Sequence, residues 1–121
     1  MRKILLVEDE PILRETYGII LSTQPYETDY AENGKDALEL CKNKQYDLIL
    51  LDVMMPVMGG VEFIKSLDNL DEMKSKIIVM SNLSSGKEVE EAAQLGIQKH
   101  LLKSDISPSQ LISEIRYYLE A

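Results

Sequence analysis

Short aliphatic runs, each closed by a polar residue, constrain the fold of this chain more than any other feature. Residues 4–7 and 48–51 each contain four aliphatic side chains with no polar residue between them. Runs of this length are typical of strands buried on both faces, as in the middle of a parallel sheet. Residues 77–80 and the shorter stretch 100–102 follow the same pattern. The chain is therefore expected to build a parallel β-sheet.

Helical patterns separate these runs. The sequence predicts strands at about 3–7, 27–31, 48–52, 77–80 and 100–102. It predicts helices from Pro11 to before Pro25, through 37–41 to about 44, over 61–67, over 87–95 and through 111–119, the last opened by a capping box at 107–110. Such βα units indicate an α/β fold, a doubly wound five-stranded parallel sheet with five helices. The flavodoxin-like strand order 2-1-3-4-5 is favoured over a Rossmann-type half because the chain has no room for six strands.

Composition limits the classes of function. The 121 residues suit one domain over 1–121, and no linker or repeat suggests a second domain. The formal net charge of −8 disfavours nucleic acid, which requires a basic patch, and anionic membranes. No signal peptide or membrane-spanning apolar stretch is visible, so a cytoplasmic protein is expected. The single cysteine, Cys41, rules out an internal disulfide.

Acidic side chains stand at the ends of two predicted strands that should be neighbours. Glu8 and Asp9 follow the first strand, and Asp52 ends the third. Crowded carboxylates repel one another unless a cation neutralises them, and hard oxygen ligands suit Mg²⁺, with Mn²⁺ as the alternative. Because no histidine or cysteine joins the acids, a zinc site is not expected.

Ser81 and Lys103, at the ends of the fourth and fifth strands, complete this set of residues. Acids, a hydroxyl and an amine around one sheet edge suit a dianion, and Asp52 can act as a nucleophile that forms an aspartyl phosphate. The metal and Lys103 would stabilise charge on the transferring phosphoryl group, and Ser81 would donate a hydrogen bond to it. Singly, each residue has an ordinary alternative: Asp9 as a helix cap, or Lys103 as a surface lysine. Their combination favours the chemical interpretation.

The arrangement resembles the receiver domains of two-component response regulators, in particular the single-domain, chemotaxis-regulator-like ones. The resemblance covers the entire chain, and the matching residues are Glu8, Asp9, Asp52, Met55, Pro56, Gly60, Ser81 and Lys103. It implies a stand-alone response regulator with Asp52 as the phosphoacceptor. It also implies that Asp9, Asp52 and the backbone carbonyl of Met54 ligate Mg²⁺, with Glu8 acting through water. Ser81 and Lys103 would contact the phosphoryl group.

The resemblance further implies how the signal passes on. The phosphoryl donor would be a histidine kinase or a phosphotransfer protein, and a downstream effector would bind the face formed by helix four, strand five and helix five. The protein would be a monomer or a weak dimer through that face. It would be a switch that catalyses only its own phosphotransfer and dephosphorylation. A phospho-independent interaction domain, an aspartate-nucleophile phosphatase and a flavin carrier are the competing classes, and each lacks part of its expected pattern here.

Two departures from the family pattern concern the fifth strand and its end. His100 stands where Tyr or Phe is usual. Either it is a switch residue that turns inward toward Ser81 and brings pH sensitivity, or it is an exposed histidine on a short edge strand. Ser104 replaces the family's proline, whose preceding bond is cis. A cis bond before serine costs about 3 kcal/mol, so the isomer of this bond stays open at this point.

Two further departures lie in the loops beside Asp52. Asn82 is larger than the residue usual after Ser81, and we expect it to limit access to Asp52 together with Met54. Gly59 replaces the commoner acidic residue, with little expected consequence for the chemistry. As an alternative, Gly59 and Gly60 together would form no more than a flexible turn.

Overall fold

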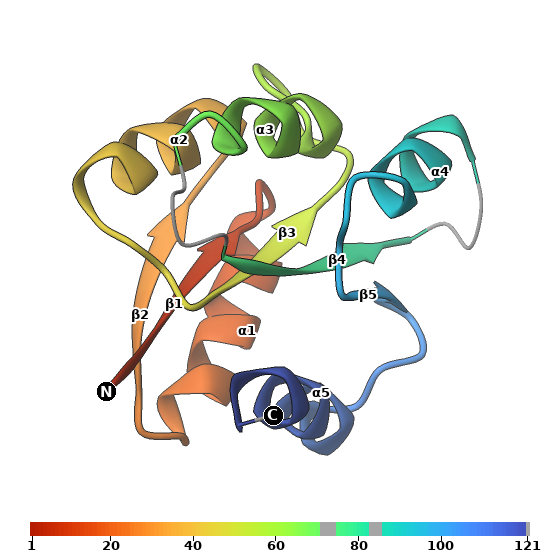
Figure 1. Ribbon diagram of the computed structural model, residues 1–121. Helices are drawn as coiled ribbons and strands as arrows, with labels where there is room; N and C mark the ends of the chain where they lie inside the picture. The colour runs from red at the N-terminus through yellow and green to blue at the C-terminus, as the bar shows by residue number, and fades with distance from the viewer. Residues whose placement is uncertain (71–74, 83–85, 121) are drawn as a thin grey trace.

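The computed structural model shows a parallel sheet between two layers of helices (Figure 1). It describes residues 1–70, 75–82 and 86–120. In chain order the elements are β1 (Arg2–Val7), α1 (Pro11–Ser22), β2 (Tyr26–Ala31), α2 (Gly34–Asn43), β3 (Leu48–Asp52), α3 (Gly60–Leu67), β4 (Lys76–Ser81), α4 (Lys87–Ala93), β5 (Lys99–Leu102) and α5 (Pro108–Glu120). The strands pair in the order β2-β1-β3-β4-β5, and every pairing is parallel. The predicted fold class and strand order are confirmed.

The aliphatic runs form the core on both faces of the sheet. Alternate residues of a strand point to opposite faces, so Leu5 belongs to the core cluster that includes residues of α2, α3 and α4, whereas Leu6 belongs to the cluster that includes residues of α1 and α5. Figure 1 shows the same division, with α2 and α3 above the sheet and α1 and α5 below it. All five residues of β3 are buried. Burying each Leu or Ile side chain contributes about 1.5–3 kcal/mol, so β1 and β3 are held firmly from both sides.

The helix ends follow the local sequence. The Ser107 hydroxyl accepts from the Gln110 backbone N–H at 3.2 Å, and the Gln110 side chain accepts from the Ser107 backbone N–H at 2.8 Å, so the predicted capping box is present. Helix α4 ends at Ala93, earlier than predicted, because a tighter turn carries the chain to Gly96, whose φ is +83°. None of the helices in the described part of the chain is long and apolar enough to cross a bilayer.

Candidate functional site

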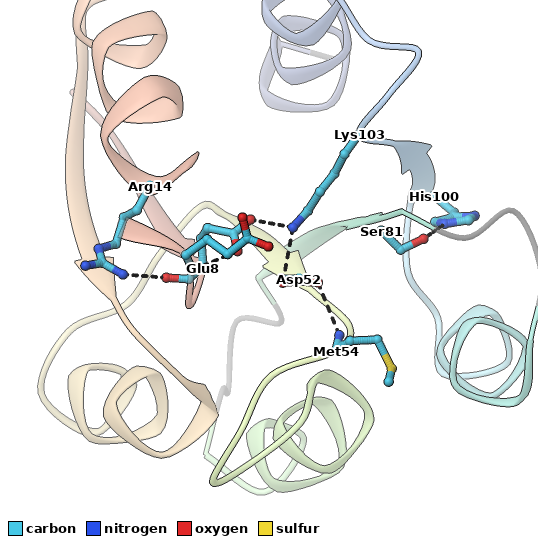
Figure 2. A network of polar contacts seen from close by, with 8 residues as sticks. Glu8, Arg14, Asp52, Met54, Ser81, His100 and Lys103 are labelled. Atoms are coloured by element: carbon cyan, nitrogen blue, oxygen red, sulfur yellow. Dashed lines mark hydrogen bonds and ion pairs between the residues drawn. The ribbon is translucent and has the colours of Figure 1, made fainter. Parts of the chain in front are cut away.

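The side chains predicted from the strand ends converge at one edge of the sheet. Val7 of β1 pairs with Leu51 of β3, which places the residues that follow them side by side. Carboxylate oxygens of Glu8, Asp9 and Asp52 lie within 4.8 Å of one another. Figure 2 shows Lys103 reaching the same place from beyond β5. The predicted cluster of three acids and one amine is therefore a real spatial cluster.

Lys103 is held between two acids. Its Nζ lies 2.6 Å from Glu8 Oε1 and 3.1 Å from Asp52 Oδ2 (Figure 2), and its side chain is only 5% exposed. Burial disfavours the charged ammonium, but the hydrogen bond to Glu8 and the charges of Asp52 and Glu8 outweigh it, so the pKa of Lys103 is raised. The Lys103 backbone N–H also donates to the Ser81 carbonyl at 2.8 Å. The alternative of an ordinary surface lysine is wrong.

Asp52 is a nearly buried carboxylate. The residue is 5% exposed, and its Oδ1 accepts from the Met54 backbone N–H at 3.2 Å (Figure 2). Burial raises the pKa of Asp52 to about 7, helped by the negative charge of Glu8 and opposed by the positive charge of Lys103. One oxygen is thus oriented by the backbone and the other by Lys103. This arrangement holds a single oriented carboxylate at the carboxyl end of β3.

The turn after β1 is tied to α1 by a residue that the sequence did not point to. Arg14 Nη1 donates to the Glu8 backbone carbonyl at 2.8 Å (Figure 2), and Glu8 Oε2 accepts from the Glu10 backbone N–H at 3.3 Å. These bonds hold Glu8 in a fully buried position. The N-cap of α1 is Glu10, without a side-chain capping bond, so the interpretation of Asp9 as that helix's cap is not supported. The weak signal for Arg14 was a lone basic residue one turn into a helix that follows acids.

The loop after Asp52 is shaped by a close backbone approach. A Cβ on Gly60 would lie 2.9 Å from Val53 Cα, nearer than real Cβ atoms come, and a tight 3.0 Å from the Asp52 carbonyl oxygen. A Cβ on Gly59 would meet nothing closer than 3.6 Å. Gly60 is therefore required for α3 to begin against the end of β3, and the interpretation of both glycines as a mere flexible turn is wrong for Gly60. Val57, with φ of +68°, adopts a conformation costly for a β-branched residue, which the sequence did not indicate.

Ser81 and His100 are in direct contact. Ser81 Oγ lies 2.7 Å from His100 Nε2 (Figure 2), and Ser81 is 2% exposed. His100 is half-buried and pairs across the strands with Val79, so it is not the exposed edge histidine of the second interpretation. Asn82 is exposed beside Ser81. No peptide bond in the described part of the chain is cis, so the Lys103–Ser104 bond, open at the sequence level, is trans.

The acidic cluster has the chemistry of a site for a hard cation. Glu8, Asp9 and Asp52 are the one group of three potential metal-ligating residues found among the described residues, and all three offer carboxylate oxygens. Oxygen ligands of this kind suit Mg²⁺ rather than Zn²⁺. The cluster can hold a metal ion.

Comparison with known proteins agrees with this geometry. A family model described as "Response regulator receiver domain" matches residues 4–116. The chain belongs to the response regulator receiver family. It is accordingly a signalling switch of the two-component systems, a domain that accepts a phosphoryl group from a kinase. Receiver domains interact with histidine kinases and with effectors.

The receiver domain has relatives of very different lengths. It is 32% identical over 101 residues to sporulation initiation phosphotransferase F of Bacillus subtilis, covering 84% of this chain and 81% of that protein. It is 28% identical over 118 residues to the polar-differentiation response regulator DivK of Brucella anthropi, covering 98% and 96%. It spans only 15% of the gliding motility regulatory protein of Myxococcus xanthus, a 29% identical relative over 93% of this chain.

Several solved structures share the whole fold. An N-terminal domain from Wolinella succinogenes has a TM-score of 0.90 at 30% identity, covering 99% of this chain and 95% of that one. The chemotaxis response regulator CheY4 of Vibrio cholerae has a TM-score of 0.86 at 28% identity, covering 98% and 99%. The receiver domain of a sensor histidine kinase from Pseudomonas aeruginosa, with magnesium coordinated in its active-site cleft, has a TM-score of 0.89 over 99% and 98%. At 23% identity it supports the fold alone.

Proposed function

We propose that this receiver domain accepts a phosphoryl group on Asp52 from a histidine kinase or a phosphotransfer protein. The observation that carries the proposal is the environment of that carboxylate: it ends a fully buried strand, is almost buried itself, and lies 3.1 Å from the Lys103 ammonium. A buried nucleophile with an oriented cation beside it suits the transfer of a charged group.

The residues of the site have separate parts in the transfer. A carboxylate oxygen of Asp52 bonds to phosphorus while the bond from phosphorus to the donor breaks, and the electron pair leaves with the donor. Lys103 carries positive charge where negative charge develops on the phosphoryl oxygens. Water cleaves the same acyl phosphate later, so the domain catalyses only its own phosphorylation and dephosphorylation.

Mg²⁺, with Mn²⁺ as the alternative, is the metal we assign to the acidic cluster. Asp9, Asp52 and the Met54 backbone carbonyl would hold it directly and Glu8 through water, and the ion would neutralise phosphoryl charge. Glu8 is fully buried and pairs more closely with Lys103, at 2.6 Å, than Asp52 does at 3.1 Å, which supports an indirect role for Glu8.

Phosphorylation is read out, in this proposal, at the face formed by α4, β5 and α5. Ser81 contacts the phosphoryl group and is linked to β5 through His100, the switch residue, while Met54 and Asn82 border the access to Asp52. The domain acts on its own and binds a downstream effector protein, either as a monomer or as a weak dimer through that face. Support comes from the relatives of similar length and from the direct contact between Ser81 and His100.

Phosphorylation by a small donor tests the assignment of Asp52. With acetyl phosphate and Mg²⁺, intact-mass spectrometry should show one phosphoryl adduct on the wild type and none on Asp52→Asn. Asp29→Asn is the matched control, since Asp29 lies on the edge strand β2 away from the site, and it should be modified like the wild type. An unchanged adduct on Asp52→Asn would disprove the assignment.

Metal titration tests the assigned ligands. In a calorimetric titration with Mg²⁺, Asp9→Asn should lose more affinity than Glu8→Gln, because only Asp9 is assigned direct ligation. Equal losses, or a larger loss in Glu8→Gln, would contradict the ligand assignment and leave phosphorylation of Asp52 to be judged by the first experiment.

A further inference from the structure

The contact between Ser81 and His100 restricts what the serine hydroxyl can do. The two heavy atoms are 2.7 Å apart, which is a short hydrogen bond between a hydroxyl and an imidazole nitrogen. Ser81 is buried at the end of β4, and its carbonyl is held by the Lys103 backbone N–H at 2.8 Å. The hydroxyl is therefore positioned from two sides, by the backbone of the strand and by the ring of His100.

Hydrogen-bond chemistry separates two roles for His100. A serine hydroxyl has one proton to donate, and a neutral imidazole has one donor and one acceptor nitrogen. If Nε2 is the acceptor, the hydroxyl proton is committed to His100, and Ser81 must break that bond before it donates to a phosphoryl oxygen. If Nε2 carries the proton, His100 donates to Ser81 and the contact does not use the hydroxyl proton. In the first arrangement His100 hinders donation from Ser81 to the phosphoryl group, and in the second it assists that donation.

We propose that His100 is a positioning residue, which donates its Nε2–H to the Ser81 hydroxyl and directs the hydroxyl proton toward the phosphoryl group on Asp52. The inference rests on the proposed function of Asp52 and Ser81. Phosphoryl oxygens accept hydrogen bonds and cannot donate them, so a hydroxyl that serves them keeps a second partner only by accepting from it. The short contact is thus retained throughout phosphorylation, and both bonds in the relay from His100 to Ser81 to the phosphoryl group point the same way.

An aromatic ring without an N–H group could not orient the Ser81 hydroxyl in this way. Phenylalanine at position 100 keeps an aromatic ring on β5 but has no N–H group to donate. Glutamine places an amide N–H at about the distance that Nε2 occupies in histidine, and so restores the donor without the ring. The pair of substitutions therefore separates donation from shape.

The rate of phosphorylation by acetyl phosphate, with Mg²⁺ present and followed by intact mass, measures the role of His100. His100→Phe should lower this rate about fivefold, the effect of one lost hydrogen bond, and His100→Gln should restore most of it. In a Ser81→Ala background the same substitution should change nothing, because His100 acts through the hydroxyl. A rate that rises or stays level in His100→Phe, or an equal loss in both backgrounds, would overturn the proposal.

The ¹⁵N chemical shift of the imidazole gives a second readout that needs no phosphoryl transfer. In the wild type, Nε2 should have the shift of a protonated nitrogen with and without acetyl phosphate, and the shift should move in Ser81→Ala. An unprotonated Nε2 would overturn the donor role even if Asp52 is the phosphoacceptor. Conversely, an adduct that persists on Asp52→Asn would refute the proposed function while leaving the Ser81–His100 bond as observed.

Discussion

Replacing Asp52, the proposed phosphoacceptor, with asparagine should stabilise the metal-free domain, and the gain should depend on pH. Burial raises the pKa of Asp52 from an ordinary value of 3.8 to about 7. Between those values the folded protein holds a proton that the unfolded chain has released, so the wild type loses stability as the pH rises through this window. Asp52→Asn has no proton to lose. Its advantage should therefore grow from about pH 4 to about pH 7 and stay constant above.

The size of the effect follows from the same shift. A pKa shift of this size changes the free energy of unfolding by at most about 4 kcal/mol. Asparagine also loses the ion pair with Lys103, which retains Glu8 at 2.6 Å as its other partner. We expect about half of the maximum, or about 2 kcal/mol at pH 7.5, to survive this loss. Urea unfolding of both proteins in EDTA at pH 4.5 and pH 7.5 measures the difference.

Asp29→Asn provides a control of opposite sign. The hydrogen bond from Tyr46 and the neighbouring Lys44 lower the pKa of Asp29, so its carboxylate contributes stability that is present above the ordinary pKa and is lost as the pH falls through the folded value. This variant should be less stable than the wild type at pH 7.5, with a smaller deficit near pH 4. If Asp52→Asn is no more stable than the wild type at pH 7.5, or if its advantage is the same at both pH values, the buried carboxylate is not the source of the penalty.

Four more substitutions, one of them a control, test the loops around the site. Gly60→Ala should lower the free energy of unfolding by about 1–3 kcal/mol through the backbone clash, whereas Gly59→Ala should stay within about 0.5 kcal/mol; equal losses in urea unfolding would contradict the close approach. Val57→Gly should gain about 0.5–1 kcal/mol in the same assay, since the φ of +68° suits glycine and the side chain is 76% exposed; a loss would show that the valine is not strained. Asn82→Ala should speed phosphorylation by acetyl phosphate, and a flat or lower rate would show that Asn82 does not limit access.

The candidate site was largely predictable because its residues follow strands that the sequence marks clearly. An aliphatic run such as residues 48–51 can be buried on both sides only in the interior of a sheet, and the polar residue that ends it must then lie at the sheet's edge. In a parallel sheet these ends meet at one edge, so the sequence predicts that Glu8, Asp52, Ser81 and Lys103 lie together.

The contacts within the site were not predictable in the same way. Lys103 and Glu8 are 95 residues apart in the chain and yet form the shortest ion pair of the site. Arg14 holds a backbone carbonyl, an interaction that carries no residue-type signal in the sequence. The strain at Val57 is likewise invisible to propensities, which assign valine to strands.

By itself, the sequence determined the α/β class, the positions of the strands and the set of side chains gathered at one edge, because hydrophobic periodicity is a local property of the chain. Only the tertiary structure decided that Lys103 lies buried between two acids, that burial raises the pKa of Asp52, and that His100 contacts Ser81. The physical reason is that burial and hydrogen-bond distance depend on how separate elements pack, to within a few tenths of an ångström. No local pattern in one segment records that packing.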